Sequence, residues 1–203
     1  MAICRESLHK KGLANVKFVL IDVRDIATIE RAKETVEKAE RKLDVLVNNA
    51  AISRNDVVQH PSILDTSVLR DVLETNLIGL VQTTTTFLPL LRKSSEPNIV
   101  NVSSQLGSQT YQSQPTATTI FTAYANSKAA VNSYTVALAH ELGKEGIKVN
   151  AVSPGLVSSR LNNFIAGGKT LEEGAQAIVP FVLLEKDGPT GKLFNSEGEK
   201  VPW

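Results

Sequence analysis

The chain has 203 residues, of which 42% are apolar and 21% charged, as is usual for one globular domain with its own core. Its 22 basic and 21 acidic residues leave a net charge of +1, which gives no electrostatic basis for binding nucleic acid or an anionic membrane. No apolar stretch is long enough to span a bilayer, and Cys4 is the only cysteine, so we predict a cytoplasmic protein without disulfides.

Short apolar runs alternate with amphipathic segments, which is the pattern of a parallel sheet wrapped by helices. A helix is predicted for Met1 to Lys11, and Gly12 is a typical residue to end it. The predicted strands, which are rich in apolar residues, are 16–23, 43–47, 99–102, 147–152 and 192–194. The other predicted helices are 29–40, 66–92, 121–142 and one that begins at Leu171. Because no repeat or linker interrupts this pattern, we predict a single α/β domain over residues 1–203.

Tyr124 and Lys128 stand four residues apart in a predicted helix, so the phenol and the ammonium share one face. Their ordinary pKa values, about 10 and about 10.4, suit neither group for proton transfer at neutral pH. A cation beside the phenol favours the phenolate, which would lower the pKa of Tyr124 toward neutral pH. A pair with this spacing is most often simple helix packing, so its meaning depends on the rest of the sequence.

Polar residues and sharp turns follow three of the predicted strands. Asn49–Ala50 follows the second strand, Ser104 the third and Pro154–Gly155 the fourth. The carboxyl ends of parallel strands meet at one edge of the sheet, where open α/β sheets bind their ligands. Asn76 lies in an otherwise apolar helix and needs hydrogen-bond partners if it is buried. Its role is either catalytic or a structural bond to a neighbouring strand.

Five motifs occur in order along the chain, namely Asn-Asn-Ala (48–50), Asn-x-x-Gly (76–79), Val-Asn-x-Ser-Ser (100–104), Tyr-x-x-x-Lys (124–128) and Asn-x-Val-x-Pro-Gly (150–155). In this order they resemble the short-chain dehydrogenase/reductase family, and the resemblance runs from about Val16 to the C-terminus. It implies a Rossmann-like, doubly wound parallel sheet and a nicotinamide cofactor.

The resemblance also implies a role for each matching residue. Tyr124 would be the general acid in carbonyl reduction, with Lys128 lowering its pKa and holding the nicotinamide ribose. Ser104 would hydrogen-bond the substrate oxygen, and Asn76 would hold a water that links Lys128 to solvent. No metal site is expected. The cofactor-binding residues that it implies are Asp22, Val23, Asn49, Ala50, Tyr124, Lys128, Pro154, Gly155, Val157 and Ser159.

The family's phosphate-binding motif, Gly-x-x-x-Gly-x-Gly, occurs nowhere in the 203 residues. The resemblance therefore predicts an N-terminally truncated sheet that lacks the first β-α-β unit. The 16–23 strand would then either pair directly with 43–47 or remain an unpaired edge, and both outcomes expose apolar surface.

Ser104 and Tyr124 are separated by more residues than is common in the family, and the inserted segment resembles that of monomeric carbonyl reductases. Pro202–Trp203 resembles the same branch. In that branch the inserted segment covers the usual helix-packing interface, so the resemblance favours a monomer. Segments 105–122 and 156–169 are expected to shape the pocket for a small-molecule substrate.

Two hypotheses follow. In the first, the chain is an oxidoreductase that reduces an aldehyde or ketone, or oxidises the alcohol, with NADPH preferred to NADH by analogy alone. In the second, it is an inactive family member that does not bind its cofactor and acts at most as a protein-interaction module. The matching catalytic residues favour the first hypothesis, and the missing glycine-rich loop favours the second.

Overall fold

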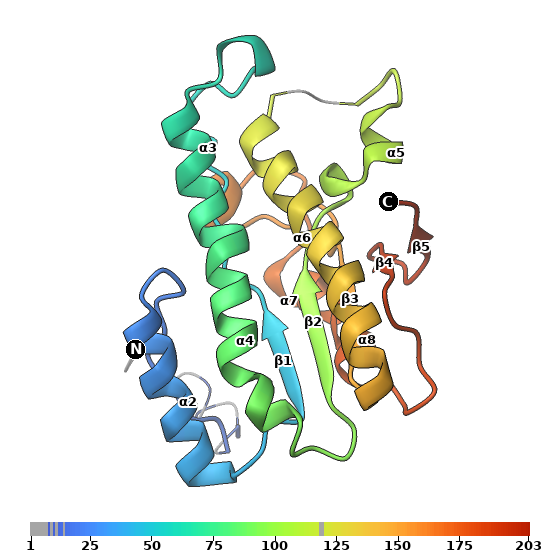
Figure 1. Ribbon diagram of the computed structural model, residues 1–203. Helices are drawn as coiled ribbons and strands as arrows, with labels where there is room; N and C mark the ends of the chain where they lie inside the picture. The colour runs from blue at the N-terminus through green and yellow to red at the C-terminus, as the bar shows by residue number, and fades with distance from the viewer. Residues whose placement is uncertain (1–7, 9, 11, 14, 118–119) are drawn as a thin grey trace.

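The computed structural model describes residues 8, 10, 12–13, 15–117 and 120–203, and its centre is a five-stranded sheet (Figure 1). The strands are neighbours in chain order: β1 (Val45–Asn48), β2 (Asn98–Val102), β3 (Lys148–Val152), β4 (Leu193–Phe194) and β5 (Lys200–Val201). β1 to β4 run parallel and β5 is antiparallel to β4. Four predicted strands are thus confirmed, whereas β5 was not predicted.

Helices cover both faces of this sheet, as expected for an α/β fold. Figure 1 shows α2, α4 and α6 in front of the strands and α7 and α8 behind them. The α-helices are α2 (Ile26–Glu40), α3 (Thr66–Leu73), α4 (Gly79–Leu91), α5 (Gln109–Gln112), α6 (Thr122–Leu142), α7 (Leu171–Gln176) and α8 (Val179–Val182). Because both faces are covered, every residue of β2 and β3 is buried.

The predicted helix 66–92 is confirmed as one continuous rod, although it is not α-helical throughout. A π-helical turn, η2 (Glu74–Ile78), joins α3 to α4 and holds Asn76. Such turns are rare and are often found at functional sites. Short 3₁₀ turns are η1 (Pro61–Ile63), η3 (Gln105–Gly107), η4 (Gly143–Glu145) and η5 (Arg160–Asn162).

The strand predicted at 16–23 is wrong, because this segment is irregular up to a turn at Val23 and Arg24. It neither pairs with β1 nor forms an edge strand. Hydrogen bonds connect the end of this segment to the start of α2. The Asp22 amide donates to Thr28 Oγ1 at 2.9 Å, and Asp25 caps the helix. Without a neighbouring strand, a β-strand leaves its main-chain groups unpaired. The predicted apolar exposure is confirmed, because Leu20 is 62% and Val47 of β1 is 39% exposed.

The helix predicted for Met1 to Lys11 lies largely outside the described residues, although Leu8 and Lys10 are helical. Gly12 has a φ of 81°, the left-handed conformation typical of a residue that ends a helix. Among the described residues, no helix is long and apolar enough to cross a membrane.

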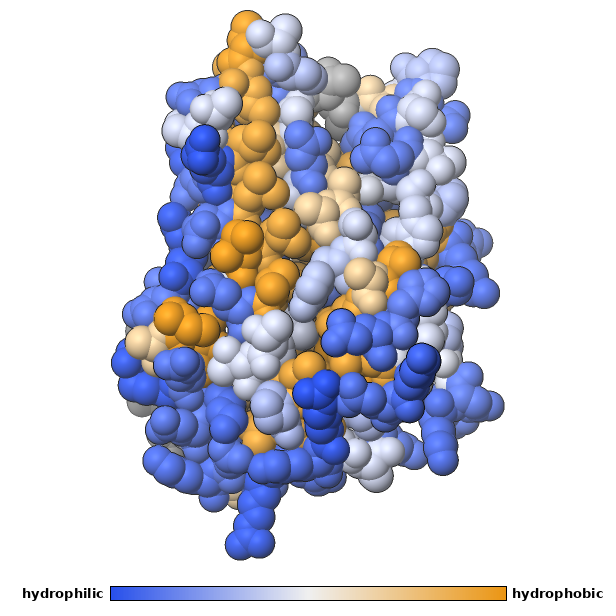
Figure 2. Space-filling model, viewed as in Figure 1, coloured by the Kyte–Doolittle hydropathy of each residue, from blue (hydrophilic) through white to orange (hydrophobic). Residues whose placement is uncertain are grey.

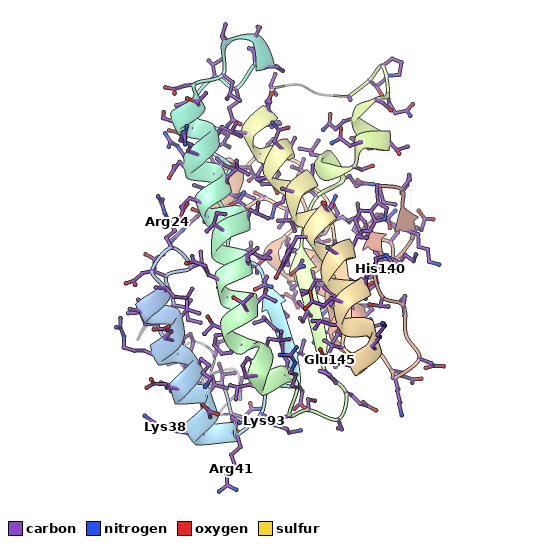
Figure 3. All side chains as sticks on the ribbon, in the orientation of Figure 1. Arg24, Lys38, Arg41, Lys93, His140 and Glu145 are labelled. Carbon is purple, nitrogen blue, oxygen red and sulfur yellow. The ribbon has the colours of Figure 1, made fainter. Side chains whose placement is uncertain are left out.

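Charged side chains gather where the strands begin. Lys38, Arg41 and Lys93 lie at this end, the lower one in Figure 3. The Lys93 ammonium lies 2.8 Å from the carboxylate of Glu37, and this ion pair joins the end of α4 to α2. Most of the polar residues predicted to form the site lie at the opposite end, where the strands finish.

Apolar side chains gather along α3 and η2 on the face shown in Figure 2. Of the large apolar side chains in and beside these helices, Ile63 is 67% and Ile78 is 43% exposed. The inserted segment packs through η3 against α6. Ile63 and Ile78 are thus exposed on this surface, and the monomeric state remains a prediction.

Candidate active site

Tyr124 and Lys128 lie on one face near the N-terminus of α6, as their spacing predicted. Both line a cavity of about 860 Å³ at the carboxyl ends of the strands. Lys128 Nζ lies 5.6 Å from the centroid of the Tyr124 ring and donates a hydrogen bond to the Val102 carbonyl at 2.8 Å. This bond attaches the lysine to the end of β2, so the helix and the sheet hold the pair together.

The strand-end residues converge on the same cavity. Ser104 follows β2, Asn49–Ala50 follows β1 and Pro154–Gly155 follows β3, and all of them line it. Val157 and Ser159, from the segment after the Pro-Gly turn, line it as well. The sequence could predict this convergence because parallel strands finish at one edge of a sheet.

The turn after β2 brings Ser104 close to α6. The Ser104 hydroxyl accepts a hydrogen bond from the Leu106 amide at 3.1 Å and thereby caps η3. A Cβ on Gly107 would lie 2.6 Å from the carbonyl carbon of Lys128. Glycine is therefore required for the close approach of η3 to the helix that carries Tyr124 and Lys128.

Asn76 does not line the cavity but lies buried behind it. Its Oδ1 accepts from the Ile52 amide at 2.8 Å, and its Nδ2 donates to the Ile52 carbonyl and to Ser127 Oγ, both at 2.9 Å. These bonds connect the rod to the loop after β1 and to α6. They agree with the predicted structural role of Asn76, although its partners lie in a loop and a helix and not in a strand. A catalytic role for Asn76 stays a prediction.

Asp22 and Val23 do not line the cavity, in contrast to the other predicted cofactor-binding residues. The Asp22 carboxylate accepts from the Arg24 amide at 2.9 Å, and the Val23 carbonyl accepts from Gln82 at 3.2 Å. A Cβ on Gly79 would lie 2.8 Å from Val23 Cγ2, so Val23 is packed against the rod. The physical reason is that the described residues provide no strand for this segment to pair with, so Asp22 and Val23 belong to a turn and not to the sheet.

Gln59 is a functional candidate that the sequence did not reveal. It is 1% exposed, and its Oε1 accepts from the Ala123 amide at 3.1 Å in the first turn of α6. Its Nε2 donates to the carbonyls of Ser53 and Arg54 at 2.8 and 2.7 Å. Gln59 thus connects the start of the Tyr124 helix to the loop that forms the cavity wall.

A buried row of polar side chains was also missed. Asn48 of β1 donates to Asn101 of β2 and to Thr84 of α4, each at 2.9 Å. Asn101 donates in turn to Thr135 of α6 at 2.9 Å. The only signal for it was the asparagines within apolar strands, since their partners lie far away in the sequence.

Burial has the largest effect on the pKa values of Tyr124 and Lys128. Desolvation raises the pKa of Tyr124 to about 12, although a hydrogen bond with Ser104 lowers it in part. The predicted lowering by Lys128 is therefore wrong for the protein without ligands. Desolvation also lowers the pKa of the Lys128 ammonium to about 8. At neutral pH both groups still carry their protons. Among the described residues, no three His, Cys, Asp or Glu side chains are placed to hold a metal ion.

The buried Lys128 is expected to make stability rise with pH. Its pKa is about 8 when folded, against an ordinary value of 10.5, so between these pH values the unfolded chain binds more protons. The free energy of unfolding should increase over this range by about 3 kcal/mol from this residue. Urea unfolding at several pH values should show this increase missing in Lys128→Met and retained when the exposed Lys144 is replaced by methionine. An unchanged pH slope in Lys128→Met would contradict the burial argument.

Comparisons with known proteins agree with this geometry. The family model for short chain dehydrogenases matches residues 2–169. Salutaridine reductase of Papaver somniferum is 30% identical over 254 residues, covering 94% of this chain and 81% of that protein. The NADPH-bound carbonyl reductase from chicken fatty liver has a TM-score of 0.84 at 26% identity, covering 100% of this chain and 82% of that one. Carbonyl reductase Sniffer of D. melanogaster has a TM-score of 0.85 at 25% identity, covering 100% and 84%.

Proposed function

Because this chain belongs to the short-chain dehydrogenase/reductase family, we propose that it reduces an aldehyde or ketone, or oxidises the corresponding alcohol, with a nicotinamide cofactor. The observation that carries the proposal is the convergence of Ser104, Tyr124 and Lys128 on one cavity. These side chains come from a strand end and a helix, and each has a part in moving a proton to a carbonyl oxygen.

Tyr124 carries the proton that the proposed role as an acid requires, although its raised pKa makes it a weaker donor than a free phenol. With a pKa of about 12, its phenol keeps its proton at neutral pH and can donate it to the substrate oxygen. The Ser104 hydroxyl would donate a second hydrogen bond to that oxygen, and the Lys128 ammonium would stabilise the phenolate left behind. Hydride is the chemistry that a bound nicotinamide supplies, because no side chain can donate it.

The residues present fit one half of such a cofactor. Gly155 lines the cavity with a φ of 81°, a conformation that favours glycine, and a Cβ there would crowd Ser196 Oγ at 3.2 Å. Together with Asn49, Ala50 and Lys128 it would hold the nicotinamide and its ribose. In the part of the chain that the structure describes, the adenosine half has no comparable partners, because Asp22 lies outside the cavity and the glycine-rich motif does not occur in the sequence. NADPH and NADH differ only in the 2′-phosphate of the adenosine half, so these residues favour neither, and NADPH is named by analogy with the NADPH-bound chicken carbonyl reductase alone.

Cofactor binding tests this proposal. Thermal unfolding and fluorescence titration should be run with NADPH, NADH, reduced nicotinamide mononucleotide and adenosine 2′,5′-bisphosphate. At a hundredfold excess over Kd, NADPH should add about 2.7 kcal/mol of stability, a melting shift of several degrees. Reduced nicotinamide mononucleotide should bind and the adenosine compound should not. No shift with millimolar NADPH would contradict the proposal for this chain.

The alternative is a family member without cofactor that acts as a protein-interaction module. The exposed apolar side chains of Phe18, Leu20 and Ile21 favour it, since such patches mark protein-binding surfaces. Absence of cofactor binding together with self-association in sedimentation experiments would support this alternative. The monomeric state and the cytoplasmic location stay predictions.

A further inference from the structure

The cavity is almost free of charge. Of the described residues that line it, Lys128 is the only one with a basic side chain, and none is Asp or Glu. The Lys128 ammonium is 3% exposed, donates to Val102 at 2.8 Å and faces the Tyr124 ring. It is therefore committed to the proton-transfer pair and is not available as a counter-ion for the remainder of a ligand.

Several charged residues are direct sequence neighbours of lining residues without lining the cavity themselves, namely Arg54, Asp56, Arg160, Glu172 and Glu173. Arg54 shows how one of them is held away. Arg54 stands between Ser53 and Asn55, which both line the cavity. Its φ of 50° is left-handed, and its guanidinium binds Asp71 at 2.8 Å and Asp56 at 3.2 Å. Two carboxylates and the backbone conformation thus hold this cation away from the cavity while its neighbours face into it.

Apolar side chains form the cavity wall beside Ser104 and Tyr124. Leu106, Tyr111 and Phe121 contribute it from the inserted segment, and Leu156 and Leu161 from the segment after β3. None of these five residues is among those proposed to hold the cofactor. This wall is therefore the part of the cavity that remains for a substrate.

The chain's C-terminal residues hold this wall in place. Ser108 Oγ donates to the Pro202 carbonyl at 2.6 Å, and the amide and hydroxyl of Thr110 donate to the main-chain oxygen of Trp203 at 3.1 and 2.8 Å. Gln112 donates to the Leu106 carbonyl at 3.1 Å. The apolar wall thus exists before a substrate binds.

We propose that the substrate is a neutral carbonyl compound with a bulky apolar body, and that carbonyl compounds carrying a carboxylate or ammonium group are excluded. The inference rests on the proposed function, since it assumes that the carbonyl lies at Ser104 and Tyr124. A charge carried to this apolar wall loses its hydration and finds no free opposite charge among the lining residues. The Lys169 ammonium, which lies beside Gly155, is paired with Glu197 at 3.4 Å. An apolar body loses only the water around it.

Two pairs of aldehydes test the proposal; the members of each pair differ in charge, and those of the first pair have the same shape. The first pair is para-neopentylbenzaldehyde and para-(trimethylammoniomethyl)benzaldehyde. The second is methyl para-formylphenylacetate and the free carboxylate. The methylene spacer keeps the electronic effect on the carbonyl small. With NADPH, kcat/KM should be about tenfold or more higher for the neutral member of each pair. Equal or higher kcat/KM for a charged member would overturn the proposal.

A charge placed on the wall should change this preference. Tyr111 is 43% exposed, so replacement is expected to leave the fold intact. Tyr111→Lys should reduce the ratio of kcat/KM between the ester and the carboxylate by about threefold. Tyr111→Asp should reduce the ratio between the neopentyl and the ammonium compound by a similar factor. Tyr111→Lys should increase the ratio of kcat/KM between the neopentyl and the ammonium compound, and Tyr111→Asp should increase that between the ester and the carboxylate. No change in either variant would show that the charge preference does not arise at this wall and would overturn the proposal.

Failure of the proposed function gives a different result. If none of the four aldehydes is reduced, the oxidoreductase proposal fails, but melting shifts with the same compounds still report the preference of the cavity. Larger shifts with both neutral compounds would support a neutral, apolar ligand. The proposal of a neutral, apolar ligand would be overturned if the two members of a pair gave equal melting shifts, or if a charged member gave the larger shift. It would also be overturned if neither neutral compound shifted the melting temperature.

Discussion

Replacing Tyr124 by phenylalanine is expected to lower kcat for aldehyde reduction by about 10²–10⁴-fold, the usual contribution of a positioned proton donor. The phenol lines the cavity and is protonated at neutral pH, and we expect it to give its proton to the carbonyl oxygen. Phenylalanine keeps the ring, and with it the contact with Lys128. The loss should therefore appear in kcat, measured with NADPH and para-neopentylbenzaldehyde, and not in the melting temperature.

Tyr134 provides the matched control. It lies on the same helix, is partly buried and does not line the cavity. Tyr134→Phe should retain kcat, since it removes a phenol that cannot reach the substrate. If Tyr124→Phe keeps nearly full activity, or if both variants lose it equally, Tyr124 is not the proton donor.

Replacing Gln59 by leucine is expected to lower the free energy of unfolding by about 3 kcal/mol or more. Leucine has a similar size but cannot bond the Ala123 amide or the carbonyls of Ser53 and Arg54. The site is closed to bulk solvent, because Gln59 is 1% exposed, so these groups would lose their partners without regaining water. Urea unfolding measures the loss.

The same substitution should also reduce activity in the folded protein, because the first turn of α6 positions Tyr124. Gln82→Leu is the control, since Gln82 is partly buried and makes one bond, to the Val23 carbonyl at 3.2 Å. It should cost about 1 kcal/mol and leave kcat unchanged. A similar loss of stability in both variants would mean that the bonds of Gln59 have no special structural role.

Local patterns were enough to predict most of the fold and many residues of the candidate site. Apolar runs such as 99–102 and 147–152 predicted β2 and β3, because a strand covered on both faces must be apolar along its length. The four-residue spacing of Tyr124 and Lys128 predicted a shared helix face. The placement of Ser104 and Gly155 after parallel strands predicted that they would meet at one edge.

Contacts between distant segments decided the rest. The 16–23 segment has a strand-like sequence but remains irregular, because a strand needs a neighbour and the described residues provide none. The pKa of Tyr124 rises because the folded chain removes much of the water around the phenol, which no local spacing reveals. Gln59 holds the start of α6 across 64 residues of sequence, and Arg54 is kept out of the cavity by Asp71. Periodicity records which face of an element is buried, but hydrogen bonds and burial depend on what the fold places opposite that face.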